Sequence, residues 1–265
     1  MDVISWLVEV TELSSSILLL LILCAFFAGF IDAIAGGGGL LTVPALLASG
    51  LPPHMALGTN KLAATFGSIT ASYTFYKKQL FSPAFWKLSI LTTAIGAISG
   101  TVMVSIIQAE VLNKVLPLLI GFSALYALFN PVKASDQKQL PNDCPHLATK
   151  QSSQGFVLGF YDGFAGPGTG AFWTVSNLIL YKMDILMSSG VARAMNFVSN
   201  FCSLVAFVYL GHVNYLLGLA MGIFLMVGAY TGAHSAIRFG NKFIRPIFTL
   251  VVSFMAVKLA LDAWF

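Results

Sequence analysis

The segment DAIAGGGGLL, residues 32–41, places an aspartate and four consecutive glycines inside an otherwise apolar run. A second segment, DGFAGPGTGA at 162–171, repeats this composition in a similar apolar setting. Glycine lowers helix stability, and an aspartate at bilayer depth is costly. A non-helical turn at that depth is tolerated only where protein or a water-filled cavity surrounds it. The two segments therefore predict interrupted helices that are shielded from lipid.

The composition is that of a polytopic membrane protein. Of 265 residues, 57% are hydrophobic and only 9% are charged, whereas a soluble domain has about 25% charged residues. The mean hydropathy is +0.85. Because basic residues of such proteins mark cytoplasmic loops, the net charge of +4 does not indicate a nucleic-acid partner. The three cysteines form no metal-ligand pattern, so we expect no metal and no cofactor.

Apolar segments follow one another along the chain, and some of them are too short to cross a bilayer alone. The only long polar stretch, NPVKASDQKQLPNDCPHLATKQSSQ at 130–154, divides the chain nearly in half. We expect a first transmembrane repeat at 1–130, a cytoplasmic linker at 131–154 and a second transmembrane repeat at 155–265. The apolar segments lie at 17–35, 40–49, 56–76, 88–107, 111–129, 155–166, 170–181, 187–210, 213–237 and 244–264.

The two halves of the chain resemble each other. GFIDAIAGGGG at 29–39 aligns with GFYDGFAGPGT at 159–169, with identical residues at six positions. Short apolar segments interrupted by Gly or Pro at corresponding places in two halves are typical of transporter binding sites. The sequence thus predicts an all-α polytopic membrane protein of two repeats. Each repeat is a Gly-broken pair of short helices plus three transmembrane helices.

The cations in the loops indicate how the broken pairs run. If each pair formed one interrupted span, six loop cations would lie inside and five outside. If each pair returns to its starting side, with the N-terminus outside, ten lie inside and only Lys114 outside. The positive-inside rule favours the second arrangement. Both termini are then periplasmic and the repeats are inverted, whether the pairs are re-entrant hairpins or short full spans.

Backbone groups of the interrupted segments are candidate anion ligands. Helices that begin near Leu40 and Gly170 would present free N–H groups and a positive dipole end to an anion. The segments lack the Gly-Lys-Ser/Thr ending of a phosphate loop, which argues against a nucleotide site. The alternative is that the glycines only permit close helix packing, as expected for GAISG at 96–100. The candidate backbone donors are Gly37, Gly38, Gly39, Gly168, Thr169 and Gly170.

Two helices carry polar stripes at helical spacing. One stripe begins at Lys61 on 56–76 and the other at Arg193 on 187–210, and an offset of 132 residues aligns the two cations. Each cation is close enough to a helix end to reach a lipid headgroup, but polar neighbours on the same face favour the protein interior. We therefore expect both cations to attract an anion, with Asn60, Asn196 and Asn200 as hydrogen-bond donors.

Asp32 and Asp162 are the acidic residues of the interrupted segments. An unpaired carboxylate at depth tends to become neutral, which suits a proton carrier. A nearby Lys61 or Arg193 would instead keep the carboxylate ionised as a counter-charge. The sequence leaves both roles open, and we name the two aspartates as candidates for ion coupling.

At AGFIDAIAGGGGLLTVPALLASGLPPHMALGTNKLAATFGS (28–68) and GFYDGFAGPGTGAF (159–172), the chain resembles the sulfite exporter TauE/SafE (TSUP) family. The resemblance covers nearly the whole chain and is closest to the YfcA-like branch. It implies a multi-pass transporter of the bacterial inner membrane for anionic sulfur compounds or organic acids, usually moved outwards. We expect an alternating-access exporter of sulfite, an organosulfonate or a related organic acid, with or without protons, and not an enzyme. The alternative is a cation transporter or passive channel that uses the aspartates.

The topology predicts that the linker faces the cytoplasm. Single cysteines at Ser135 and Ser153 should therefore be inaccessible to a membrane-impermeant maleimide added to the periplasmic side. The measurement is labelling in intact cells compared with labelling after the inner membrane is permeabilised. Labelling from the periplasm would contradict the inverted arrangement.

Overall fold

The computed structural model describes residues 14–116, 118, 140–142, 144–240 and 243, and these contain helices and no strand. The expected segment 244–264, most of 111–129 and the first part of the linker lie outside these residues. The first half contains α2 (Ser15–Ala35), α3 (Gly38–Ala48), α4 (Pro53–Lys77) and α5 (Lys87–Ser105). The second half contains α7 (Leu147–Phe164), α8 (Thr169–Tyr181), α9 (Ile185–Tyr209) and α10 (Tyr215–Phe239).

Among the described helices, α2, α5, α9 and α10 are long and apolar enough to cross a membrane. The 21 residues of α2 extend about 31 Å at 1.5 Å each, which matches the hydrocarbon thickness of about 30 Å. By contrast, α3 has 11 residues and α8 has 13, too few to cross. The first broken pair is therefore unequal, a long helix followed by a short one. Exposed apolar side chains such as Leu20, Leu91 and Ile223 provide a lipid-compatible outer surface.

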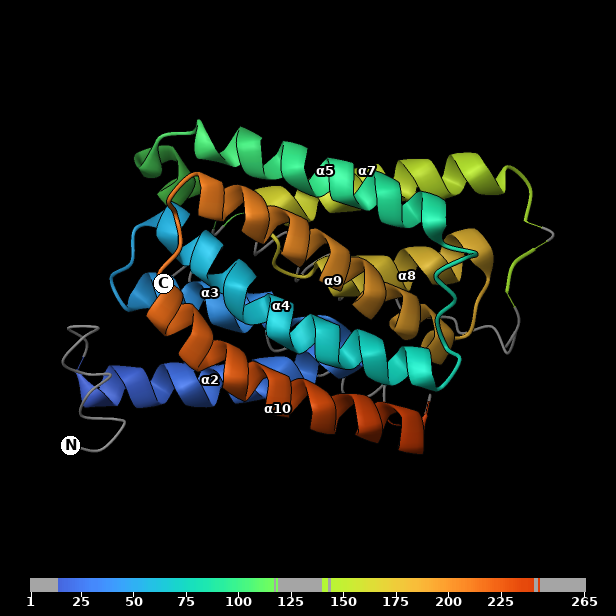
Figure 1. Cartoon of the computed structure of the whole chain (residues 1–265), viewed down its shortest axis with the longest axis horizontal. Helices are drawn as coiled ribbons and strands as arrows, with labels where there is room; N and C mark the ends of the chain where they lie inside the picture. The colour runs from blue at the N-terminus through green and yellow to red at the C-terminus, as the bar shows by residue number, and fades with distance from the viewer. Residues whose placement is uncertain (1–13, 117, 119–139, 143, 241–242, 244–265) are drawn as a thin grey trace.

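Each broken pair forms a hairpin whose outer ends lie on one side of the molecule. Leu18 at the start of α2 and Leu46 at the end of α3 pack in one cluster with Met221 at the start of α10. At the opposite end, Tyr181 at the end of α8 packs in a cluster with Leu147 at the start of α7. The α2–α3 and α7–α8 hairpins thus enter the helical bundle from opposite ends (Figure 1).

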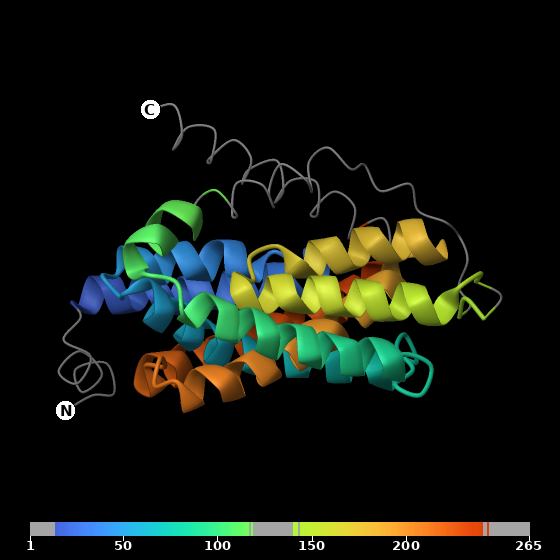
Figure 2. The same ribbon diagram turned by 90° about the horizontal axis from the view of Figure 1, so that it is seen from above.

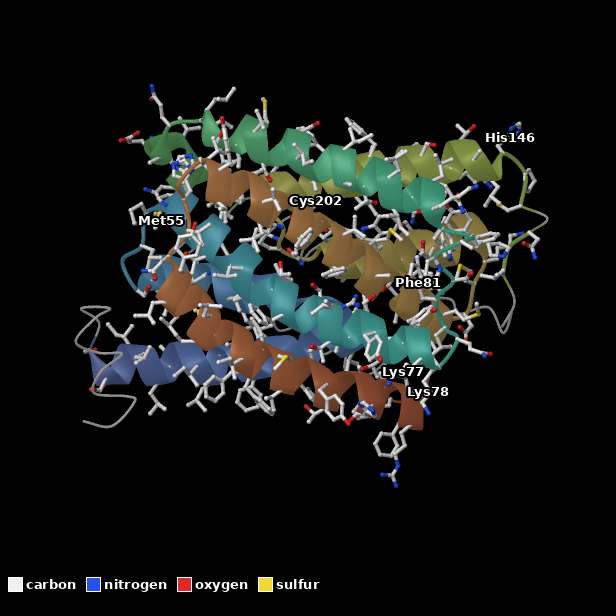
Figure 3. The ribbon with its side chains drawn as sticks, viewed as in Figure 1. Met55, Lys77, Lys78, Phe81, His146 and Cys202 are labelled. Carbon is white, nitrogen blue, oxygen red and sulfur yellow. The ribbon has the colours of Figure 1, made fainter. Side chains whose placement is uncertain are left out.

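Most of the described loop cations lie at the end where the α7–α8 hairpin enters, and Lys114 is the exception among them. Lys77 and Lys78 lie where α4 ends, at the opposite end of the molecule from Met55 (Figure 3). Lys87 begins α5 and Arg238 lies in the last turn of α10, and both of these helix termini are at the same end (Figure 1). It is the end that the sequence predicts to face the cytoplasm.

Glycines allow two pairs of helices to pack closely. Figures 1 and 2 show α5 beside α7 along their length, and α2 packs against α10 in the same way. A Cβ atom on Gly100 of α5 would overlap the carbonyl oxygen of Phe160 in α7. A Cβ atom on Gly228 of α10 would overlap the carbonyl oxygen of Phe26 in α2. The expectation that GAISG supports close helix packing is confirmed.

Helix α7 begins inside the segment expected to be a polar linker. Gln151 donates from Nε2 to the carbonyl oxygen of Phe85 at 3.2 Å. Gln154 donates from Nε2 to Asn177 Oδ1 at 2.8 Å and accepts from the Tyr181 hydroxyl at 2.9 Å. These glutamines can be buried because the turn before α5 and helix α8 provide their hydrogen-bond partners. Local hydropathy does not reveal such partners, so the sequence placed this helix start too late.

Replacing Gly100 with alanine should lower the thermal stability of the protein. The added Cβ atom meets a backbone carbonyl, so α5 and α7 must move apart at a cost of about 1–3 kcal/mol. Ser99→Ala is the matched control, because Ser99 is exposed on the same helix and its hydroxyl donates only within it, to the Ile95 carbonyl oxygen. Thermal unfolding in detergent measures both variants. Equal melting temperatures would contradict the close α5–α7 contact.

Candidate functional site

The two helix breaks touch each other inside the bundle. The N–H of Ala171, in the first turn of α8, donates to the carbonyl oxygen of Gly36 at 3.2 Å. Gly36 has φ +86° and Gly166 has φ +90°, in the left-handed region that favours glycine. A Cβ atom on Gly36 would overlap the backbone of Gly170. Sequence analysis missed both Gly36 and Gly166 as site residues, although they are identical positions of the aligned segments.

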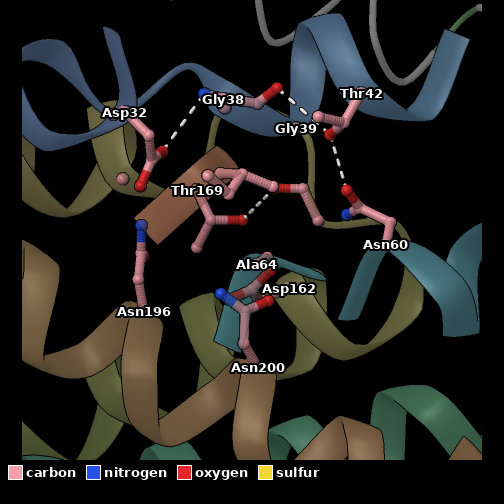
Figure 4. A pocket seen from close by; sticks show the side chains of 15 residues that line it. Asp32, Gly38, Gly39, Thr42, Asn60, Ala64, Asp162, Thr169, Asn196 and Asn200 are labelled. Atoms are coloured by element: carbon pink, nitrogen blue, oxygen red, sulfur yellow. Dashed lines mark hydrogen bonds between the residues drawn. The ribbon is translucent and has the colours of Figure 1, made fainter. Parts of the chain in front are cut away.

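The breaks enclose a small polar cavity of about 30 Å³ (Figure 4). Such a volume holds about two water-sized groups. The N-termini of α3 and α8 and the polar faces of α4 and α9 line the cavity. Three of the expected site residues do not line the cavity. Gly37 is not among its lining residues, and the side chains of Lys61 and Arg193 are buried next to the cavity. The other expected residues line it, namely Asp32, Asp162, Asn60, Asn196, Asn200, Gly38, Gly39, Gly168, Thr169 and Gly170.

Lys61 and Asp162 form a tight ion pair with all of the ammonium hydrogens in use. Lys61 Nζ lies 2.7 Å from Asp162 Oδ1, and it also donates to the Asp162 carbonyl oxygen at 2.6 Å. Its third N–H donates to Asn200 Oδ1 at 3.1 Å. The Ser199 hydroxyl donates to the other carboxylate oxygen of Asp162. Because an ammonium group has three donors, Lys61 has no free donor for a ligand in this arrangement.

Arg193 and Asp32 form a looser ion pair. Arg193 Nη1 lies 3.4 Å from Asp32 Oδ2, and the arginine side chain is fully buried while 21% of the Asp32 side chain is exposed. Asp32 Oδ1 accepts from the Gly38 N–H at 3.1 Å, in the first turn of α3 (Figure 4). Among the described residues, the three guanidinium nitrogens have no hydrogen-bond partner. Because unsatisfied buried donors are costly, this guanidinium is a strong donor that a ligand can use.

Each ion pair joins the first half of the chain to the second. Asp32 of the first half pairs with Arg193 of the second, and Lys61 of the first pairs with Asp162 of the second. The two pairs together give the cavity no net charge when all four groups are ionised. Lys61 and Arg193 were expected to have the same role, but their contacts differ. Lys61 uses all of its donors within the protein, whereas the Arg193 nitrogens have no hydrogen-bond partner among the described residues.

Amide side chains complete the polar lining. Thr42 Oγ1 donates to Asn60 Oδ1 at 2.5 Å. Asn196 and Asn200 project from α9 towards the glycine turns (Figure 4), and the Oδ1 atom of Asn196 has no hydrogen-bond partner in the described part of the chain. Thr42 and Ser199 were not predicted. Ser199 lies beside the polar stripe on α9, while Thr42 sits in an apolar segment that provides no signal.

Broken helices that bring a polar, charged cavity into an apolar bundle are typical of membrane transporters. The family model for the sulfite exporter TauE/SafE matches residues 21–259, and the chain belongs to this family. The chain is 38% identical to the probable membrane transporter protein YfcA of Escherichia coli K12 over 240 residues, 90% of this chain and 88% of that protein.

Two other relatives match this chain over almost their full lengths. A probable membrane transporter protein of Haemophilus influenzae is 36% identical over 256 residues, 96% of this chain and 99% of that protein. The probable membrane transporter protein ORF9 of Sinorhizobium is 35% identical over 251 residues, 95% of each chain. No solved structure matches the chain. The protein is thus a membrane transporter of the TauE/SafE family.

Removing one partner of the tight ion pair should destabilise the protein. Lys61→Gln leaves the Asp162 carboxylate buried without a counter-charge, at a cost of about 3–5 kcal/mol. The matched control is the double variant Lys61→Gln/Asp162→Asn, which removes both charges and should recover most of the lost stability. Thermal unfolding in detergent measures all three proteins. A single variant that melts like the wild type would show that the pair does not stabilise the fold.

Proposed function

We propose that this protein is a secondary transporter that moves a small anion through the cavity by alternating access. Sulfite, an organosulfonate or a related organic acid is the substrate class. The observation that carries the proposal is the buried Arg193 guanidinium, whose N–H groups lack hydrogen-bond partners among the described residues. A guanidinium binds the oxygens of such anions through two parallel hydrogen bonds.

The backbone supports an anion site in the same place. The N-termini of α3 and α8 both reach the cavity, through Gly38, Gly39, Thr169 and Gly170. Helix N-termini carry free N–H groups and a partial positive charge, and both favour an anion. Both aspartates are paired with cations, which leaves no net negative charge to bind a cation. The helix N-termini and the Arg193 N–H groups without hydrogen-bond partners therefore favour an anion over the alternative cation substrate.

We also infer that the two halves are inverted repeats around the cavity. In one half-to-half interface, Gly100 of α5 meets Phe160 of α7. In the other, Gly232 of α10 meets Phe30 of α2. The same offsets, 132 and 130 residues, relate these contacts and the two ion pairs. Because the hairpins enter from opposite ends, the axis that relates the halves would lie in the membrane plane, as in transporters that rock one repeat against the other.

The narrow cavity is consistent with alternating access. The cavity of about 30 Å³ holds about two water-sized groups, fewer than the heavy atoms of an anion with three or four of them around a central atom. The two hairpins must therefore separate to admit the substrate from one side at a time. The chain has no nucleotide-binding motif, so an ion gradient or the gradient of the anion itself would drive transport. We propose that the protein lies in the inner membrane with its cation-rich end in the cytoplasm. We also propose that it usually exports its substrate.

The test of this function is anion binding by Arg193 variants. Sulfite, methanesulfonate and acetate are titrated into detergent-purified protein by calorimetry, with choline as the cation for comparison. Arg193→Gln should weaken binding by about 1.5–3 kcal/mol, roughly tenfold to a hundredfold, because a charge-assisted contact is lost. Arg193→Lys should recover only part, since the planar fork is missing.

The matched control for the lost charge is Lys77→Gln, because Lys77 is exposed and lies at the end of α4, away from the cavity. This variant should bind like the wild type. Unchanged anion affinity in Arg193→Gln, or binding of choline in place of the anions, would contradict the proposed function.

A further inference from the structure

We infer that Asp32 is a tethered occupant of the anion site, and that substrate binds there only when Asp32 takes up a proton and releases Arg193. This inference rests on the anion transport proposed above and assigns the coupling role to one of the two aspartates.

The Asp32 carboxylate already occupies the position expected for an anion. It accepts a hydrogen bond from the Gly38 N–H at the start of α3 and lies 3.4 Å from the Arg193 guanidinium. A helix N-terminus together with an arginine is the arrangement that binds free oxyanions. Because a carboxylate and the proposed substrate use the same donors, the two compete for Arg193.

Asp162 is held in place and is not a comparable occupant. Lys61 and Ser199 each donate to one of its carboxylate oxygens. The position 132 residues before Ser199 is Gly67, which has no hydroxyl to offer Asp32. A Cβ atom on Gly67 would lie 3.0 Å from Leu225 Cδ2, so an apolar side chain takes the corresponding space. Asp32 therefore lacks a side-chain hydroxyl contact of the kind that Ser199 makes to Asp162.

Arg193 is the charged partner that faces Asp32. Helix α3 has no titratable residue, and on α8 the titratable residue is Tyr181 at its far end. On α10, Tyr230 and His234 are exposed on the outer surface. On α4 and α7, the nearby charges are Lys61 and Asp162, which neutralise each other. Arg193 is thus the charged group in direct contact with Asp32 among the described residues.

Charge balance links the proton to the anion. With both ion pairs intact the cavity is neutral, so a bound monoanion would leave one uncompensated negative charge in a low-dielectric site. A proton on Asp32 restores neutrality and frees the guanidinium. The neutral carboxyl group also becomes an O–H donor for the anion. One proton therefore accompanies each monoanion in the same direction, and the gradients of both species set that direction.

The test uses methanesulfonate, a monoanion whose own charge does not change near neutral pH. Calorimetry in two cationic buffers of different ionisation enthalpy counts the protons taken up on binding. The wild type should take up one proton per anion, and its affinity should fall about tenfold per pH unit once Asp32 is ionised, as reciprocal linkage requires. Asp32→Asn should take up none and bind with an affinity independent of pH.

Glu110→Gln is the matched acid-to-amide control, because Glu110 is exposed and does not line the cavity. It should keep the uptake of one proton. Binding without proton uptake in the wild type, or proton uptake that persists in Asp32→Asn, would overturn this inference alone. The pH dependence of the wild type tests it even if Asp32→Asn does not fold. Failure of the wild type to bind sulfite, methanesulfonate or acetate at any pH would overturn the proposed function as well.

Discussion

The backbone contact between the two glycine breaks is the constraint on which the site depends. The carbonyl oxygen of Gly36 accepts from the Ala171 N–H, and no side chain fits where Gly36 meets Gly170. Because the chain leaves the helical path at both breaks, the N-termini of α3 and α8 lie inside the bundle. Their N–H groups find no water in a membrane and must be satisfied by protein or by the contents of the cavity. Asp32 does so for the Gly38 N–H, and the Gly36 carbonyl oxygen does so for the Ala171 N–H.

The buried charges follow from the same geometry. Lys61 and Arg193 are almost completely inaccessible to solvent, and an isolated charge in that position would be strongly unfavourable. Each cation is compensated by an aspartate from the other half, so the charges can be buried only when the halves are assembled. The pair with Ser199 and Asn200 around it joins the halves firmly. The Asp32–Arg193 pair has fewer hydrogen bonds and is therefore held less firmly.

Most of the fold could be predicted from the sequence because the signals are local. Apolar length and the glycine interruptions placed α2 to α5 and α8 to α10 within a few residues of their observed bounds. The start of α7 was placed too late, because Gln151 and Gln154 are polar in sequence and acquire partners only from the turn before α5 and from α8. The cavity-lining residues were largely predicted as well, since acid, break and repetition coincide at the same positions. The signal is weaker for Thr42, whose hydroxyl matters only because Asn60 lies beside it.

By itself, the sequence determined that this is a helical membrane protein with two interrupted segments, four charged residues within its apolar stretches and the residues of the TauE/SafE family. Hydrophobic length, helix-breaking residues and charge are properties of short stretches, so they are readable without a structure. Only the tertiary structure decided that Asp32 pairs with Arg193 and Asp162 with Lys61, and that the two pairs differ. The reason is that the partner of a buried charge is set by how α2, α4, α7 and α9 assemble across the two halves. That packing depends on contacts between residues more than 100 positions apart, which no local pattern encodes.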